Sequence, residues 1–318
     1  MYSNLSNFSE DINTSFIVIF SVISFFLIAI TATIILFLFK YRQKKNPEPT
    51  QIEGSVLLEI IWTIIPLGLV IGMFYYGWMA WIPMLSDAPK DAIEVKTTAR
   101  MWSWLFEYEN GKKTDTLYLP EGKPVELQMT SPDVLHSLYI PAYRIKRDIV
   151  PGRVTNIWFE PRKTGEYDLF CAEYCGLQHS YMITEVKVLT QEEFDKWYID
   201  TTAVTKAAAT PGAEGLQILR MNGCIACHSL DGSKLVGPSY KGIWGHEAEV
   251  ETKGQKRTIL VDEAYVINSI YNPDEDIVVG FSKGLMRSYK GELTDEDIEK
   301  IIAYLKTLSD KHEEESNE

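Results

Sequence analysis

Positive charge is scarce in this chain of 318 residues. It has 31 Lys and Arg against 44 Asp and Glu, a net charge of −13, and its basic residues form no patch interleaved with aromatics. Such a chain repels phosphate backbones, so nucleic acid is disfavoured as a partner. There is no internal repeat, and the acidic tail after Lys311 is the one low-complexity tract. Because 24% of residues are charged and 46% hydrophobic, the composition excludes a disordered chain and a pure membrane channel.

Two long apolar runs near the N-terminus predict a transmembrane hairpin. Residues 16–39 contain no charge and, at about 1.5 Å per residue, are long enough to span a bilayer core of about 30 Å. No small-residue cleavage site follows them, so we expect an uncleaved anchor. Residues 56–83 hold one charge, Glu59, and end in aromatic residues typical of a membrane interface. Four basic residues between the runs predict a cytoplasmic loop, which places both termini and the soluble part on the outer, periplasmic side.

The rest of the chain divides into two soluble domains joined by a linker. Over residues 91–200, short β-like runs alternate with turn residues, which predicts an all-β sandwich or barrel. Residues 201–212 are small and polar and contain a Pro-Gly pair typical of a linker. Over residues 213–318, apolar residues recur at helical spacing. We therefore expect a multi-domain chain with a hairpin anchor over 1–90, a β domain, a linker and a helical domain.

Only four cysteines are present, one pair in each soluble domain. The first pair lies in CAEYCGLQHSYM, which supplies Cys171, Cys175, His179 and Met182, and His136 precedes it by 35 residues. Thiolates, imidazoles and a thioether are the ligands that copper selects over magnesium or calcium, so this cluster predicts a copper site. The alternative is a disulfide between Cys171 and Cys175, in which the histidines and the methionine are ordinary surface or core residues.

The second pair lies in CIACH, which supplies Cys224, Cys227 and His228. C-x-x-C-H is the attachment signature of c-type heme: both thiols bond the porphyrin and the histidine ligates the iron. A thioredoxin-like redox pair is the alternative, but no βαβ pattern surrounds the motif. Of the two methionines in this domain, Met221 lies too close to the motif to reach the far face of a heme. Met286 is therefore the expected distal ligand, with core packing as its alternative role and His246 as the competing ligand.

Several motifs resemble a known family. LEIIWTIIP, WSWLFEY, DVLHSLYIP, VPGR and CAEYCGLQHSYM occur in the order found in subunit II of heme-copper cytochrome c oxidases, over about residues 15–190. The resemblance implies a cupredoxin-like barrel that holds the binuclear copper A centre. The segment VGPSYKGIWG resembles the Gly-Pro segment of class I cytochromes c, which implies an all-α heme domain. In copper A, two bridging thiolates share one electron over both metals. The implied ligands are Cys171, Cys175, His136, His179, Met182 as a weak ligand, and the backbone carbonyl of Glu173.

The resemblance implies further roles for individual residues. Pro238 would support His228 through its backbone. Trp102 would admit electrons to copper A, or would only pack in the core. Glu59 would stand at the mouth of a proton-uptake pathway into subunit I, or would be a snorkelling interface carboxylate. The side chain of Glu173 would ligate a magnesium ion shared with subunit I, or would be a solvated carboxylate.

The chain departs from the pattern of these families at three points. It has Met101 where the oxidase family has Gln, and Arg287 where cytochromes c commonly have Pro after the distal methionine. The heme domain is also acidic, with 12 Lys and Arg against 20 Asp and Glu from residue 213 onward. Ordinary oxidases attract a basic cytochrome c to an acidic copper domain. A tether makes that attraction unnecessary, because it keeps the heme domain at a high effective concentration.

The expected function is that of an electron-entry subunit of a heme-copper terminal oxidase in the bacterial inner membrane. Electrons would pass from an external cytochrome c or a quinol:cytochrome c reductase through heme c and copper A to subunit I, which reduces oxygen to water coupled to proton pumping. Subunits I and III would be partners, and no catalytic residue is expected in this chain, which has too few histidines for an oxygen site. The alternatives are the electron-entry subunit of a copper-A nitric oxide reductase and a membrane-anchored binding module with two disulfides. Quinol oxidase subunits lack the copper ligands.

Overall fold

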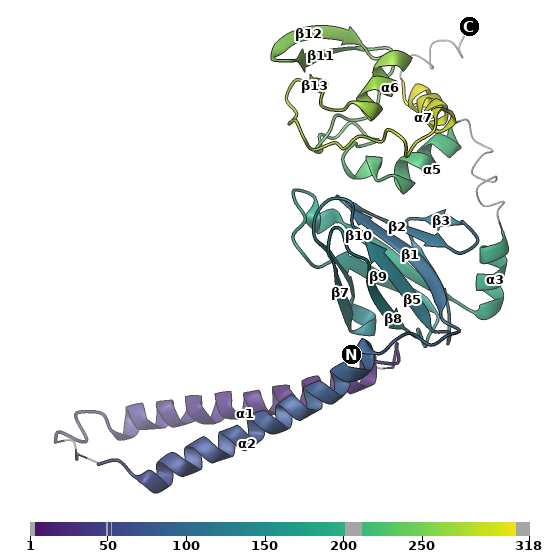
Figure 1. Ribbon diagram of the computed structural model, residues 1–318. Helices are drawn as coiled ribbons and strands as arrows, with labels where there is room; N and C mark the ends of the chain where they lie inside the picture. Colours follow the sequence, from purple (N-terminus) through teal and green to yellow (C-terminus); the bar gives the residue numbers. More distant parts are fainter. Residues whose placement is uncertain (1–3, 49, 52, 201–211, 310–318) are drawn as a thin grey trace.

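The computed structural model describes residues 4–48, 50–51, 53–200 and 212–309 (Figure 1). The described chain forms a helical hairpin, a β-sandwich and a C-terminal domain, in that order. The expected linker, apart from Gly212, and the acidic tail lie outside the described residues.

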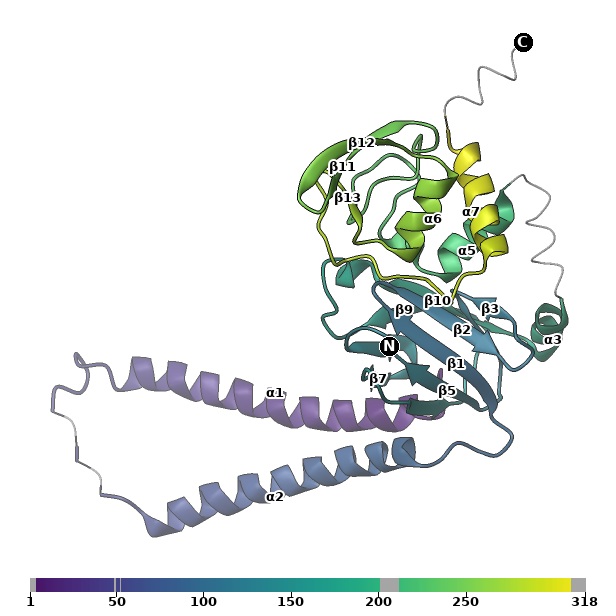
Figure 2. The same cartoon turned by 45° about the horizontal axis from the view of Figure 1, so that its top comes forward.

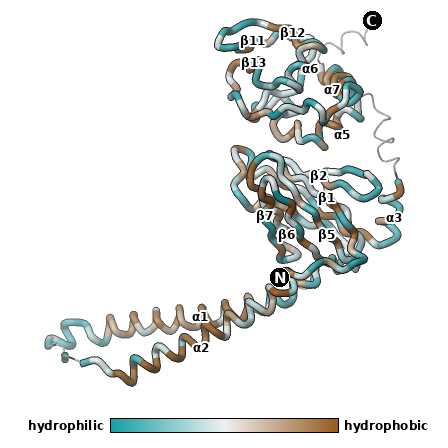
Figure 3. Tube along the Cα trace, viewed as in Figure 1, coloured by the Kyte–Doolittle hydropathy of each residue, from teal (hydrophilic) through white to brown (hydrophobic). Residues whose placement is uncertain are grey.

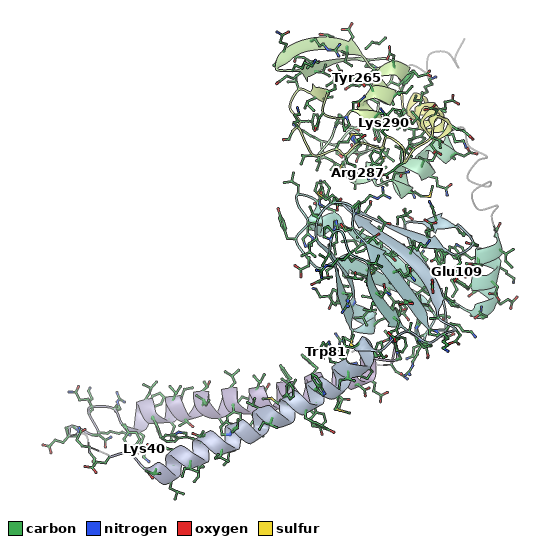
Figure 4. The ribbon with its side chains drawn as sticks, in the orientation of Figure 1. Lys40, Trp81, Glu109, Tyr265, Arg287 and Lys290 are labelled. Atoms are coloured by element: carbon green, nitrogen blue, oxygen red, sulfur yellow. The ribbon has the colours of Figure 1, made fainter. Side chains whose placement is uncertain are left out.

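Two long helices form the hairpin, α1 (Ser9–Lys40) and α2 (Val56–Trp81). Both are long and apolar enough to cross a membrane, and the most apolar stretch of each is unburied. In Figure 3 both helices are coloured mostly brown, the colour of hydrophobic residues. In Figure 4, Lys40 lies at the end of the hairpin far from the soluble domains, and Trp81 lies next to them. The basic loop is thus separated from the soluble domains by the full length of the hairpin, as expected for a loop on the opposite side of a membrane.

Polar contacts fix the start of the hairpin to the sandwich. The hydroxyl of Ser6 donates to the carbonyl of Tyr143 at 2.9 Å, and Nε of Arg144 donates to Oδ1 of Asn13 at 3.0 Å. A short 3-10 helix, η1 (Ile82–Leu85), leads from α2 to the first strand. These contacts join the membrane anchor to the end of the sandwich that lies next to the hairpin.

The sandwich consists of two five-stranded sheets. One sheet has the order β3-β2-β1-β5-β8 and the other β4-β10-β9-β6-β7. Burial alternates along strands such as β2 and β5, so every second side chain points between the sheets and fills the core. The strands are β1 (Ile93–Arg100), β2 (Ser103–Tyr108), β3 (Lys113–Thr114), β4 (Leu117–Pro120), β5 (Val125–Thr130), β6 (His136–Ile140), β7 (Ile145–Ile149), β8 (Thr155–Phe159), β9 (Gly165–Cys171) and β10 (Ile183–Leu189).

A short helix, α3 (Gln191–Ile199), closes the β domain. It begins at Thr190, which forms a reciprocal capping box with Glu193. Trp197 on α3 stacks on Tyr118 of β4 with ring centroids 4.4 Å apart. The helix therefore covers one edge of the sandwich before the chain continues to the C-terminal domain.

The C-terminal domain is built around helices α5 (Ala213–Met221), α6 (Glu263–Tyr271) and α7 (Asp295–Thr307). Helices α5 and α7 cross in backbone contact at Gly215, where a Cβ atom would lie 2.1 Å from the carbonyl oxygen of Lys300. A glycine is required there because any side chain would push the helices apart. The helical fold confirms the sequence expectation for this domain.

The C-terminal domain also contains a three-stranded antiparallel sheet, which the all-α expectation did not include. Its order is β12-β11-β13, with strands β11 (Glu247–Thr252), β12 (Gln255–Leu260) and β13 (Asp276–Val278). Lys253 and Gly254 form the two-residue turn between β11 and β12, both with positive φ, as a type I′ hairpin turn requires.

The C-terminal domain lies on the end of the sandwich opposite the membrane hairpin (Figures 1 and 2). Ala226, Cys227 and Val236 pack against the hydrophobic core cluster of the sandwich. The two soluble domains are thus in direct contact, and the C-x-x-C-H motif lies at that contact.

Candidate copper and heme sites

The expected copper ligands meet at the end of the sandwich that faces the C-terminal domain. His136 is the first residue of β6 and Cys171 the last residue of β9, and these two antiparallel strands pair in the same sheet. The loop from Cys175 to Met182 then leads into β10, the neighbour of β9. Ligands far apart in sequence are therefore held on the ends of adjacent strands, a rigid arrangement.

Short distances connect these side chains. The Sγ atoms of Cys171 and Cys175 are 3.8 Å apart, far beyond the bond length of about 2.05 Å in a disulfide, and both thiols are free. Nδ1 of His136 lies 3.9 Å from Sγ of Cys171, and Nδ1 of His179 lies 3.5 Å from Sγ of Cys175. Sδ of Met182 lies 3.8 Å from Sγ of Cys175. Two thiols, two imidazoles and a thioether thus converge, and this ligand set fits copper.

The two thiols are hydrogen-bonded to each other. The hydrogen bond between them lowers the pKa of Cys171 and raises the pKa of Cys175, because a thiolate on one side is stabilised by a thiol on the other. His136, Cys171 and Cys175 form a buried cluster whose ligand atoms all lie within 4.8 Å of one another. The two thiols therefore lie in a cluster of donor atoms that could hold a metal.

Glu173 presents its backbone and its side chain to different neighbours. Its carbonyl oxygen lies 3.3 Å from Sγ of Cys171, on the side of the copper ligands. Its carboxylate accepts a hydrogen bond from Nζ of Lys146 at 3.0 Å, and both side chains are more than a third exposed. The carbonyl is thus placed with the copper ligands, whereas the carboxylate forms a surface ion pair in this chain.

Asp133 holds the buried ligand His136 and was not identified from the sequence. Nε2 of His136 donates to Oδ1 of Asp133 at 2.8 Å, which turns Nδ1 toward Cys171. Oδ2 of Asp133 accepts from the backbone N–H of Met101 at 2.7 Å. Burial alone would lower the pKa of His136, but the hydrogen bonds with Asp133 and Cys171 raise it. The D-x-x-H spacing in SPDVLHS was the available sequence signal.

Trp102 is buried against the copper ligands, with 5% of its surface exposed. Its indole N–H donates to the carbonyl oxygen of Cys175 at 3.0 Å. A Cβ atom on Gly176 would lie 3.0 Å from the ring, so the indole packs directly on this backbone. Trp102 therefore contacts a copper ligand and fills the core at the same time.

The C-x-x-C-H motif lines a cavity of about 440 Å³ in the C-terminal domain. Cys224 begins the 3-10 helix η4 (Cys224–Ala226), and the side chains of Cys224, Cys227 and His228 all reach the cavity wall. Both thiols are free, and burial raises the pKa of each to about 11. The cavity has the size typical of a cofactor site and supplies the groups that attach heme.

His228 is held in one orientation. Its Nδ1–H donates to the carbonyl oxygen of Pro238 at 2.7 Å, which leaves Nε2 as the atom available to a metal. The ring of Tyr240 stacks on the imidazole with centroids 4.6 Å apart, and a Cβ atom on Gly237 would lie 2.5 Å from the imidazole. Burial lowers the pKa of His228, so the imidazole is neutral and able to ligate iron. Gly237 and Tyr240 were not identified from the sequence.

Met286 and His246, the two candidates for the distal ligand, both line the heme cavity. Arg287 stands where cytochromes c commonly have proline. It forms a bidentate ion pair with Glu292, with N···O distances of 2.7 and 2.5 Å, and lies 4.4 Å above the ring of Tyr289. These contacts restrain the loop after Met286 without proline.

Glu59 lies in the first turn of α2 and is exposed, at the hairpin end far from the soluble domains. It is thus separated from the copper and heme sites, which are brought together at the contact between the two soluble domains. Met101 and Asp133 of the sandwich complete the wall of the heme cavity. The two sites therefore share one boundary.

Three family models match successive parts of the chain. Residues 3–76 match "Cytochrome C oxidase subunit II, transmembrane domain", residues 112–189 match "Cytochrome C oxidase subunit II, periplasmic domain", and residues 212–309 match "Cytochrome c". A cytochrome c oxidase subunit 2 from Alkalihalophilus pseudofirmus is 30% identical over 308 residues, which cover 91% of this chain and 85% of that one. The chain belongs to the cytochrome c oxidase subunit II family.

Other members of this family match smaller parts of the chain. The subunit 2 of Cereibacter sphaeroides is 27% identical, and the match covers 54% of this chain and 69% of that one. The subunit 2 of Thermostichus vulcanus is 28% identical, and the match covers 61% of this chain and 76% of that one. The crystal structure of the periplasmic domain of subunit II of cytochrome oxidase from Bradyrhizobium japonicum is 30% identical, with a TM-score of 0.35, and covers 38% of this chain and 99% of that one.

Membership of the cytochrome c oxidase subunit II family confirms the family resemblance that the sequence motifs indicated. The chain is a membrane-anchored subunit with a periplasmic domain, it belongs to an oxidoreductase complex, and subunit I is its implied partner. The subunit II domain implies copper A and the cytochrome c domain implies heme c. The free thiols, imidazoles and thioethers described above fit both groups.

Proposed function

We propose that this chain is the electron-entry subunit of a heme-copper terminal oxidase. It receives electrons from an external donor at heme c and passes them through copper A to subunit I, where oxygen is reduced to water coupled to proton pumping. The observation that carries the proposal is the shared boundary of the two sites. Asp133 lines the heme cavity and hydrogen-bonds to His136, so one side chain joins the heme site to a copper ligand.

The copper A site is formed by residues at the cavity-facing end of the sandwich. The residues that would hold the copper ions are Cys171, Cys175, His136, His179, Met182 and the carbonyl oxygen of Glu173. When bound, copper A supplies a one-electron carrier whose charge is shared by both metals. The residues around it keep the ligands fixed: Asp133 orients His136, and the indole N–H of Trp102 holds the backbone of Cys175.

The heme c site is formed by the C-terminal domain. Cys224 and Cys227 attach the porphyrin, and His228 ligates the iron from a position fixed by Pro238. Met286 would be the second iron ligand, since it lines the heme cavity and supplies the thioether that is common in cytochromes c. When bound, heme c supplies a second one-electron carrier, and Cys227 packs against the copper domain.

The roles of three further residues belong to the same proposal. Trp102 carries electrons toward Cys175, whose carbonyl oxygen accepts its indole N–H. Glu59 lies at the cytoplasmic mouth of a proton-uptake pathway into subunit I, as expected for an ionisable group in a membrane span. Glu173 supplies a carboxylate to a magnesium ion shared with subunit I once Lys146 gives up its ion pair.

The proposed setting is the bacterial inner membrane. The domain boundaries are 1–90 for the anchor, 91–200 for the copper domain, 201–212 for the linker and 213–318 for the heme domain. Subunits I and III surround the anchor, and an external cytochrome c or a quinol:cytochrome c reductase is the donor. The acidic heme domain favours a donor with a basic surface.

Metal and heme analysis of the purified complex tests the proposal. We expect heme c attached to this chain in the pyridine hemochrome spectrum, together with two copper ions per complex beyond the copper of subunit I and the near-infrared absorption of copper A. Turnover of oxygen rather than nitric oxide distinguishes the oxidase from a copper-A nitric oxide reductase. Attached heme without copper, or copper without heme, would contradict the proposed path.

A further inference from the structure

We propose that Gly223 is the residue that docks the heme domain on the copper domain in the orientation for electron transfer, because only a glycine there lets the backbone of the heme domain reach Ser103. Gly223 is thus a positioning residue and not a ligand of either cofactor. The inference rests on the proposed transfer of electrons from heme c to copper A, and it identifies the contact that aligns the two domains.

Gly223 joins helix α5 to the C-x-x-C-H motif in a left-handed turn. Its φ is +73°, and its N–H donates to the carbonyl oxygen of Arg220, near the end of α5, at 3.0 Å. Its own carbonyl oxygen accepts a hydrogen bond from the N–H of Ala226, within the motif, at 3.1 Å. Since Cys224 follows directly, a shift of Gly223 also shifts the residues that would attach heme.

The copper domain meets Gly223 at Ser103. A Cβ atom on Gly223 would lie 2.3 Å from Oγ and 3.0 Å from Cβ of Ser103, distances too short for any side chain. The next nearest atom, Cδ of Arg100, would be 3.9 Å away, an ordinary van der Waals distance. Oγ of Ser103 is buried and has no hydrogen-bond partner among the described residues. The contact is therefore one of shape, and the size of the side chains at positions 103 and 223 decides how closely the domains approach.

Ser103 belongs to the β1–β2 hairpin, which also reaches the copper ligands. It is the first residue of β2 and directly follows Met101 and Trp102. Met101 lines the heme cavity, and the indole N–H of Trp102 donates to the carbonyl oxygen of Cys175. The heme domain thus rests on the copper domain next to a residue that contacts a copper ligand.

The close approach at Gly223 also brings Cys227 against the copper domain. Ala226, Cys227 and Val236 pack against the hydrophobic core cluster of the sandwich. A side chain at position 223 would push this edge of the heme domain away, and the contacts of Cys227 would open with it. The rate of electron transfer falls steeply with distance, so loss of the contact slows transfer without changing either ligand set.

Variants at the contact, compared in the purified complex, test the proposal. Heme c is reduced by a light pulse with a soluble photoreductant, and electron arrival is followed in the near-infrared band of copper A. Gly223→Ala overpacks the contact and lowers the population of the docked arrangement, so we expect transfer to slow about tenfold or more. In the Ser103→Gly background the same change should slow transfer little, because both of the close atoms belong to the side chain of Ser103.

Two further variants separate the contact from other effects. Gly254→Ala, in the turn between β11 and β12, also replaces a glycine of positive φ, +85°, but a Cβ atom there would meet nothing within 4 Å. It controls for backbone strain and should leave the rate unchanged. Ser103→Leu overpacks the contact from the copper domain while the heme domain keeps its sequence, and it should slow transfer as Gly223→Ala does.

A second readout does not depend on electron transfer. With both centres oxidised, a nearby ferric heme accelerates the spin relaxation of copper A in electron paramagnetic resonance. Gly223→Ala and Ser103→Leu should weaken this acceleration, and Gly254→Ala should not. The reduction potentials of both centres are measured in every variant, so that a change in driving force is not mistaken for a change in distance.

The outcomes separate this inference from the proposed function. A Gly223→Ala variant as fast as Gly254→Ala, or with the same copper A relaxation, would overturn the role of Gly223. Equal slowing by Gly223→Ala with and without Ser103→Gly would also overturn it, because strain in the backbone would then be the cause. If the unmodified complex transfers no electron from heme to copper while the relaxation still reports a nearby heme, the proposed function fails and the docking contact stands.

Discussion

Both metal sites depend on side chains that hold the ligands as well as on the ligands themselves. Asp133 orients His136, and Pro238 orients His228, each through one hydrogen bond to the ring nitrogen that faces away from the expected metal. Such bonds fix the tautomer and the direction of the coordinating nitrogen. The two domains, which differ in fold, thus position a histidine by the same means.

Cys175 is the residue whose loss distinguishes the two centres. Changing Cys175 to Ser removes one of the two bridging sulfurs, so we expect the mixed-valence copper signal in electron paramagnetic resonance to disappear. The heme absorption should not change, because Cys224, Cys227 and His228 lie in the other domain. Survival of the mixed-valence signal would show that Cys175 is not a bridging ligand.

A pair of variants tests which residue is the distal heme ligand. Met286→Ala should leave heme attached but lower its reduction potential, because a thioether ligand raises the potential of c-type heme. His246→Ala, the matched variant on the other candidate lining the cavity, should leave the potential unaltered. A redox titration of the heme absorption measures both. The reverse pattern would assign the ligand to His246.

At the residue scale, sequence spacing predicted which ligands come together, because C-x-x-C-H and C-x-x-x-C with a following His and Met are local motifs. The role of Asp133 could have been predicted in the same way, since Asp133 precedes His136 by three residues. The roles of Gly237 and Tyr240 could not, because they arise from contacts with a segment folded against them. A motif specifies ligands, whereas the tertiary fold selects the residues that support them.

Among the secondary structure elements, the close crossing of α5 and α7 determines how the helices of the heme domain pack. Gly215→Ala would place a Cβ atom against the carbonyl oxygen of Lys300, at 2.1 Å before relaxation. We expect this variant to destabilise the domain by about 1–3 kcal/mol, the usual cost of overpacking. Gln217→Ala on the same helix is the control and should have little effect. Thermal unfolding followed at the heme band measures both; equal stability would contradict the close crossing.

The start of α7 gives this domain a defined dependence on pH. Thr294 and Asp297 form a reciprocal capping box, and the hydrogen bond from the backbone of Thr294 lowers the pKa of Asp297. The stabilisation is present above the ordinary pKa of an aspartate, near 4, and is lost as the pH falls through the lowered value. Asp297→Asn should therefore cost about 0.5–1 kcal/mol at neutral pH and progressively less in acid.

Chemical unfolding at several pH values measures this effect. Glu299→Gln, an exposed change on the same helix, serves as the control and should show no such pH dependence. A difference between Asp297→Asn and the parent that persists unchanged in acid would contradict the role of the carboxylate.

The elements differ in how far the sequence predicted them. Long strands such as β1, β5 and β10 follow clear alternation, and both membrane helices follow from apolar length. The sheet β11–β13 was missed because β12 is largely exposed and its residues lack a hydrophobic face. Short strands such as β3 depend on pairing with a neighbour, which local sequence does not reveal.

At the scale of the whole molecule, the fold separates the membrane anchor from the two candidate metal sites. The hairpin fixes one end of the sandwich to the membrane, and the heme domain covers the other end (Figure 1). The sequence predicted this order of parts and their sides of the membrane. It did not predict which face of the heme domain meets the copper domain, because that face is defined by contacts such as the approach of Gly223 to Ser103, which no motif specifies.

The most direct test is a stepwise reductive titration of the purified complex, followed in the visible band of heme c and the near-infrared band of copper A. We predict that each centre takes up one electron per chain, and that heme c reduced by a light pulse is reoxidised at the rate at which copper A becomes reduced. A heme that stays reduced while copper A remains oxidised, or the absence of either band, would contradict the transfer of electrons from heme c to copper A.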